Sequence, residues 1–220
     1  MTSLKSGVKM TLMKKLSLCI FLVLMVSCSE EKSKKSVYDI KIGERIDNIL
    51  TQKQIKLYYW NPETSGDGSD KEIYGKDKKY SLVNIPSKVN IFLDKFEGVQ
   101  LVYNNENLKI THVGAYKDMN INKCLKERTK QMNIYIDKFD LKDSNIFKNE
   151  IKSINLENNV IARRTKIEFP KKKMKIYFTC YDTANYKGSK RPNSDYRFEK
   201  YSDSYAYWVL NIKKIKILNN

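Results

Sequence analysis

The stretches NINKCLKERTKQMNIYIDKFD, Asn120 to Asp140, and KMKIYFTC, Lys173 to Cys180, decide the fold of this chain. In the first, apolar residues recur every three or four positions with Arg128 as the one interruption, which is the period of an amphipathic helix. In the second, apolar and polar residues alternate, which is typical of a half-buried strand. Cys124 lies on the apolar stripe and Cys180 on the apolar face, so packing the helix on the sheet permits a Cys124–Cys180 disulfide. Two buried free thiols are the alternative.

The rest of the chain predicts more strands and one further, shorter helix. Strands are expected over Val37 to Ile42, Ile55 to Trp60, Lys79 to Ile85, Val89 to Leu93, Val99 to Tyr103, Leu108 to Tyr116, Asn158 to Phe169, Lys173 to Asp182 and Tyr201 to Ile217. The short helix is expected over Glu44 to Leu50, after Gly43. This order predicts an α+β fold, an antiparallel sheet or sheets covered by one long and one short helix. Two helix-plus-meander halves are an alternative arrangement of the same elements.

The N-terminal residues have the pattern of an export signal. Lys14 and Lys15 precede the eleven-residue apolar run Leu16 to Val26, and Ser27 is the small residue expected before a cleavage site. At about 1.5 Å per residue this run reaches only ~16 Å as a helix, roughly half of a hydrocarbon core, so it is too short to span a membrane. The segment is therefore expected to be absent from the mature protein.

Met25-Val26-Ser27-Cys28 resembles the lipobox of bacterial lipoproteins. The resemblance implies that residues 1–27 are a lipoprotein signal peptide and that Cys28 receives a diacylglycerol thioether and an acylated amino terminus. Several acyl chains anchor a protein stably to a membrane, whereas one does so only marginally. Ser29 is not the Asp that resembles an inner-membrane retention signal, which favours the outer membrane. An ordinary secreted protein is the alternative.

Behind the signal, residues 28–36 are expected to be the lipidated cysteine and a polar tether, and residues 37–220 a single α+β domain. Within that domain, Ile40 to Leu50 (IKIGERIDNIL) resembles the opening of BamE-like small outer-membrane lipoproteins, in which a glycine precedes a short amphipathic helix. No function is carried over from this short match.

The composition is strongly basic. The net charge is +17, and removal of residues 1–27, which hold four lysines and no acidic residue, leaves +13. Such a surface favours anionic partners, which in a cell envelope are lipid headgroups, lipopolysaccharide, cell-wall carboxylates or an acidic protein rather than nucleic acid. A lysine-rich solvated surface without a charged partner is the alternative.

Signs of an enzyme are few. His112 is the only histidine, it lies in a strand-like run without a nucleophile signature, and it is interpreted as an ordinary sheet histidine. No glycine-rich phosphate loop or paired-cysteine metal spacing is present in the sequence, so no cofactor or metal is expected. Asn61 to Glu72 (NPETSGDGSDKE) imitates the spacing of a calcium loop, although a hairpin loop accounts for the same residues.

Positive charge concentrates on the hairpin predicted around Pro170. Its basic residues are Arg163, Arg164, Lys166, Lys171, Lys172, Lys173 and Lys175. We take Arg163, Arg164, Lys171, Lys172 and Lys173 as the candidate partner-binding residues, because clustered charge accelerates and selects association. The alternative is the solvated face of an edge hairpin. In the last predicted strand, Tyr205 and Tyr207 are expected to point outward and to offer a second binding face.

Together these features predict a membrane-anchored, periplasm-facing lipoprotein that acts as a non-enzymatic binding module, either in envelope assembly or as an immunity-type inhibitor. An envelope hydrolase with an unrecognised site is the alternative.

Overall fold

The computed structural model describes residues 34–65, 71, 73–89, 91–139, 141, 144–155, 160–182 and 194–206, all of which belong to one compact unit, Lys34–Asn220. The predicted signal peptide, Cys28, Tyr207 and the last predicted strand beyond Ala206 lie outside the described residues, as do 66–70 and 72 of the calcium-like stretch. Among the helices described, none combines the length and the apolar character needed to cross a membrane.

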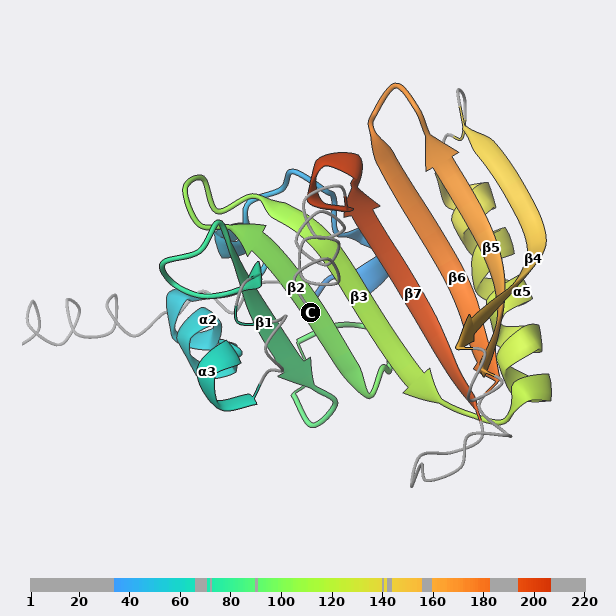
Figure 1. The fold of residues 1–220 in the computed structure, drawn as a ribbon, viewed down its shortest axis with the longest axis horizontal. Helices are drawn as coiled ribbons and strands as arrows, with labels where there is room; N and C mark the ends of the chain where they lie inside the picture. The colour runs from blue at the N-terminus through green and yellow to red at the C-terminus, as the bar shows by residue number, and fades with distance from the viewer. Residues whose placement is uncertain are drawn as a thin grey trace, which may run out of the picture. The chain divides into compact units, whose positions relative to one another are not determined.

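The described residues build a seven-stranded antiparallel sheet (Figure 1). Its strands are β1 (Tyr80–Pro86), β2 (Gly98–Asn104), β3 (Ile110–Asp118), β4 (Asn145–Asn155), β5 (Val160–Phe169), β6 (Met174–Asp182) and β7 (Ser194–Ser202). The order across the sheet is β1-β2-β3-β7-β6-β5-β4, so the last strand in the chain lies in the middle. β7 pairs with β3 on one side and with β6 on the other, which joins two meanders into one sheet.

The helical elements are the 3-10 turns η1 (Val37–Asp39) and η2 (Ile46–Asn48) and the helices α2 (Gln52–Tyr58), α3 (Pro62–Ser65) and α5 (Ile121–Lys138). η1, η2 and α5 cover one face of the sheet, whereas α2 and α3 lie beside the edge strand β1 (Figure 1). α5 packs on β6 and β7, as Figure 1 shows, while buried Ile40, Ile46 and Leu50 contribute to the same core as the side chains of β1, β2 and β3. The predicted α+β fold, with an antiparallel sheet against one long helix, is confirmed.

Two of the predicted N-terminal strands are wrong. Over Val37 to Ile42 the chain makes the turn η1, in which Val37 and Ile40, three residues apart, are buried together. Over Ile55 to Trp60 it is mostly α2, which begins at a capping box formed by Thr51 and Gln54. This reciprocal cap satisfies two backbone N–H groups at the start of a helix, and here it prevails over the strand preference of the residues that follow.

The other discrepancies concern strands placed wrongly or missed. Val89 to Leu93 is an irregular connection with an isolated bridge from Phe92 to Lys35 in place of a strand. β4 and β7 were not predicted; in β7 the buried face reads Tyr196, Phe198, Lys200, and the lysine interrupts the apolar alternation. The predicted strand from Tyr201 ends at Ser202, because the chain turns helical over 203–206.

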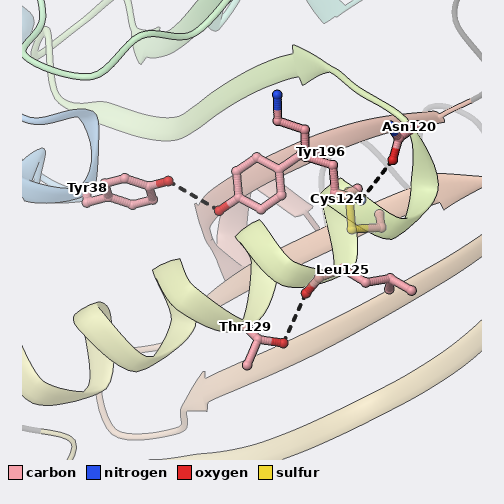
Figure 2. The surroundings of a disulfide bond; sticks show 8 residues. Tyr38, Asn120, Cys124, Leu125, Thr129 and Tyr196 are labelled. Carbon is pink, nitrogen blue, oxygen red and sulfur yellow. Dashed lines mark hydrogen bonds between the residues drawn. A yellow bond between two sulfur atoms is a disulfide. The ribbon is translucent and has the colours of Figure 1, made fainter.

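A disulfide between Cys124 and Cys180 fastens α5 to the sheet, with a Cα–Cα distance of 5.9 Å (Figure 2). The helix begins just before it, where the Asn120 side chain accepts a hydrogen bond from the Lys123 N–H at 2.9 Å. Beside the disulfide, the hydroxyls of Tyr196 on β7 and Tyr38 in η1 lie 3.2 Å apart. The helix, the N-terminal segment and the central strand therefore meet around this bond.

We expect the disulfide to contribute substantially to stability. The bond joins residues 56 positions apart, and in the chain-entropy model closing a loop of that length is worth about 4 kcal/mol. Urea unfolding of the oxidised protein and of the Cys124→Ala/Cys180→Ala variant should differ in midpoint accordingly. Equal midpoints would contradict the expectation.

Lys200 holds the N-terminal segment against the core face of β7. The residue is only 3% exposed, and its Nζ donates hydrogen bonds to the carbonyls of Tyr38 at 3.0 Å and Ile40 at 2.9 Å. The rings of Tyr135 and Phe198 lie 5.4 and 5.7 Å from the same nitrogen. Burial lowers the pKa of Lys200 to about 8, because the charged form loses its hydration.

The lowered pKa of Lys200 predicts a pH-dependent stability. Between about pH 8 and the ordinary pKa of 10.5 the unfolded chain binds more protons than the folded one, so the contribution of Lys200 to the free energy of unfolding rises with pH. The full change is about 3 kcal/mol, and below pH 8 the cost of the buried charge is fully present. Urea unfolding of wild type and Lys200→Met at pH 7 and pH 10 should show the wild type gaining relative to the variant. A difference that does not change with pH would refute this account.

Candidate functional site

A groove of about 460 Å³ crosses the face of the sheet opposite α5. Its polar walls come from Asn84, Glu97, Gln100, His112, Tyr116, Asp118, Arg197 and Glu199. These residues belong to β1, β2, β3, β7 and the connection before β2, so the groove extends from the edge strand β1 to the central strand β7. Side chains on strands paired in a continuous sheet are held more rigidly than side chains on loops.

The strand register explains why the sheet is hollow here. Gly114 on β3 lies opposite Gln100 on β2 and opposite Glu199 on β7, and Gln100 lies opposite Asn84 on β1. Residues opposite one another in an antiparallel sheet project to the same face. Because Gly114 has no side chain, the middle of this row is empty and its neighbours become walls.

Two glycines shape the groove in different ways. A Cβ atom on Gly98 would lie 2.4–2.7 Å from the ring of Tyr116, so that ring lies directly across Gly98. A Cβ atom on Gly114 would meet nothing closer than the His112 Cε1 atom at 3.3 Å. The missing side chain at Gly98 therefore leaves room for the Tyr116 ring that lines the groove, whereas the missing side chain at Gly114 leaves the bottom of the groove unfilled.

The groove is acidic at one end although the protein is basic. Burial, and then the charge of Asp118 and a hydrogen bond to it, raise the pKa of Glu97, as expected when two carboxyl groups share a proton. Glu199 adds a third carboxyl group to the walls. The guanidinium of Arg197 lies over the ring of Tyr181, 4.7 Å from its centroid. The groove thus offers both acceptors and donors, without the concentration of N–H groups that a phosphate requires.

His112 forms the other end of the groove. Its ring stacks on Tyr205 at 5.5 Å and meets Tyr201 edge-on at 6.3 Å. The Nδ1 atom is buried and has no hydrogen-bond partner among the described residues. Burial lowers the pKa of His112 to about 4, so the imidazole is neutral at neutral pH.

The structure separates the five basic residues predicted to bind a partner. Consecutive strand residues point to opposite faces. Arg163 pairs in register with Cys180 on the α5 face, where burial and then Arg163 lower the pKa of Arg128. Arg164 is on the groove face, where its Nε donates to Glu150 at 2.7 Å and its guanidinium lies 4.8 Å from the Tyr177 ring centroid.

The remaining members of the basic set form the turn between β5 and β6. Lys171, Lys172 and Lys173 are exposed there, and Lys173 adopts a positive φ of 48°. The five candidate residues therefore do not form one continuous surface, because strand pleating sends the two arginines to opposite faces. The exposed basic cluster is the turn alone, which we call the basic turn (Lys171–Lys173).

The prediction that Tyr205 points outward is also wrong. It is 7% exposed, its hydroxyl lies 2.6 Å from that of Tyr74, and its ring stands edge-on to Tyr80 at 5.4 Å. The prediction assumed continued strand alternation, whereas residues 203–206 are helical and fold Tyr205 back over the sheet.

The calcium-like stretch begins with a helix. Pro62–Ser65 forms α3, and Lys71 lies 3.6 Å from the carboxylate of Glu63. Within the part of the chain that the structure describes, no three His, Cys, Asp or Glu residues gather in a way that could hold a metal ion.

None of the groove residues was identified from the sequence as part of a site, and His112 was interpreted as an ordinary sheet histidine. They come from separate strands that only the topology brings together. One signal was present in β3, where His112, Gly114 and Tyr116 alternate with the apolar residues Val113 and Ala115. Comparison of the chain with protein-family models, curated proteins and solved structures found no significant match. Function is therefore argued from the groove, the charges and the N-terminal sequence.

The two glycines predict opposite responses to the same substitution. Gly98→Ala should destabilise the fold by about 1–3 kcal/mol, because the new methyl group displaces the Tyr116 ring. Gly114→Ala should change stability by no more than about 0.5 kcal/mol, because only the edge of the His112 ring must shift. Thermal unfolding of the pair checks the prediction, and equal effects would contradict the different roles of the two glycines.

Proposed function

We propose that this chain is a non-enzymatic binding module, anchored by lipid on Cys28 to the periplasm-facing side of the outer membrane, that takes a polar part of its partner into the groove over Gly114. The observation that carries the proposal is the groove itself, a hollow of about 460 Å³ walled by polar side chains on four neighbouring strands of the sheet. Concave sites with a few convergent polar groups are where proteins usually bind ligands.

The proposed location follows from the N-terminal sequence and the disulfide. The apolar run, Ser27 and Cys28 match a lipoprotein signal, and Ser29 favours the outer membrane. A disulfide between Cys124 and Cys180 suits an oxidising compartment such as the periplasm.

The proposed partner is an acidic protein or another anionic component of the envelope, met in envelope assembly or as the target of an immunity-type inhibitor. A net charge of +13 after signal removal would speed its approach. The exposed basic turn is the part of the predicted hairpin that remains available for this steering. Neither nucleic acid nor a cofactor is part of the proposal.

The test is site-specific photo-crosslinking in intact cells, followed by binding measurements on the captured partner. A photoreactive residue at Gln100, in the groove, should capture a partner that the same residue at exposed Lys53 on α2 does not. Filling the groove by Gly114→Val should then weaken binding about tenfold or more, the equivalent of at least 1.4 kcal/mol. Lys171→Glu/Lys172→Glu should slow association mainly at low salt, with Lys53→Glu/Lys56→Glu as the matched control. Equal capture at both positions, or full affinity of Gly114→Val, would refute the groove as the site.

One observation favours an envelope hydrolase as the second candidate. Glu97 has a raised pKa beside Asp118 at the end of the groove, and a protonated carboxyl group next to a carboxylate can act as a general acid. Purified protein should then hydrolyse peptidoglycan or ester substrates, and Glu97→Gln should abolish that activity while leaving binding intact. The binding-module proposal instead predicts no turnover by the wild type.

A further inference from the structure

The N-terminal tether enters the domain beside the connection between β1 and β2. The Leu93 N–H donates to the carbonyl of Lys35 at 3.0 Å, and Lys35 and Phe92 form a parallel bridge. Two residues further on, the N–H of Val37 donates to the Asp94 carboxylate at 2.5 Å. The first described residues of the chain are thus held against the connection between β1 and β2, of which residues 87–89 and 91–97 are described and which we call the anchor-side loop.

The anchor-side loop combines an exposed apolar side chain with exposed lysines. Single exposed apolar side chains are common, whereas an exposed one beside further apolar surface marks an interaction site. Leu93 is 65% exposed. Beside it lies a hollow of about 520 Å³ with Val89, Phe92 and Phe96 among its apolar walls. Lys88 and Lys95 are exposed on the same loop. Apolar side chains flanked by lysines are typical of surfaces that rest at the boundary between headgroups and acyl chains.

The distance to the proposed anchor is short. Six residues separate Cys28 from Lys35, and a fully extended chain across that interval spans at most about 25 Å. A lipid on Cys28 therefore keeps the anchor-side loop close to the bilayer whatever path the tether takes.

We propose that the anchor-side loop is the membrane-contact surface of the domain, with Leu93 inserted at the headgroup boundary and Lys88 and Lys95 against anionic headgroups. The proposal rests on the proposed lipidation of Cys28. Asp94 and Glu97 are the acidic residues of the loop, and both line the same hollow; Asp94 accepts the Val37 N–H, and Glu97 also lines the groove. Lys117 of β3 lines the hollow as well, so the three lysines at this surface, Lys88, Lys95 and Lys117, outnumber its two carboxylates.

This contact orients the rest of the sheet. Along the strands, Pro86 and Gly98 lie in the row of Tyr116 and Arg197, whereas the basic turn follows Phe169 at the other end, beyond the row of His112 and Tyr201. The loop joins β1 and β2 at one side of the sheet, and the turn joins β5 and β6 toward the other. With the loop on the membrane, the basic turn points away from it.

The test uses the full lipidated chain in vesicles of phosphatidylethanolamine and phosphatidylglycerol. Leu93→Trp should show a blue shift of emission and strong quenching by brominated lipid, beyond the signal of the native tryptophans in wild type. The matched control is Ile146→Trp, since Ile146 is 38% exposed and lies on β4, at the opposite edge and end of the sheet. This control should not differ from wild type.

A second measurement needs no substitution. Acetylation of lysines by a water-soluble reagent should label Lys88 and Lys95 several-fold less on vesicles than in detergent, while Lys171 and Lys172 are labelled equally in both. Flotation of wild type, but not of Cys28→Ser, with the vesicles establishes the anchor. If wild type floats and neither the added quenching of Leu93→Trp nor lysine protection appears, the membrane contact is refuted and the anchor stands. If wild type does not float, both proposals fail.

Discussion

The insertion of β7 between β3 and β6 is the constraint on which the structure depends. Without this pairing the two meanders, β1-β2-β3 and β4-β5-β6, would end in two unpaired edges and share no core. Side chains of β7 contribute to both faces of the sheet. Phe198 and Lys200 point into the core under the helical layer, while Arg197 and Glu199 point to the other face and complete the groove. The strand that closes the fold therefore also completes the candidate site.

On the core face of β7, two separate segments of the chain pack side by side and are held by different kinds of interaction. α5 is fastened covalently through Cys124 and Cys180. The N-terminal segment is held by the hydrogen bonds of a buried ammonium group, Lys200, to two backbone carbonyls. Charge burial disfavours the second contact near neutral pH, yet the lysine satisfies carbonyls that would otherwise be buried without partners. The tether thus joins the domain at a place where polar groups set its position.

The two faces of the sheet carry different features. The helical face holds the larger core, whereas the opposite face carries the smaller cluster of Tyr80, Leu82, Val102 and Tyr205, the ion pair of Arg164 with Glu150, and the groove. In the proposed function, general attraction would bring an anionic partner near, and the groove, which contains the carboxyl groups of Glu97 and Asp118, would select the part that enters. The two ends of the sheet also differ, because the anchor-side loop lies at one end of the strands and the basic turn lies at the other.

The sequence by itself determined the α+β class, α5 and the inward faces of Cys124 and Cys180, because periods of 3.6 and 2 depend only on which neighbours are apolar. Only the tertiary structure decided the place of β7, whose Lys200 breaks the apolar pattern and is tolerated because carbonyls distant in sequence accept its protons. The tertiary structure also decided the groove, because Gly114 forms its bottom only when Gln100 of β2 and Glu199 of β7 lie on either side of it. Local patterns report which face of an element is buried, and they carry no information about which distant strand will lie alongside.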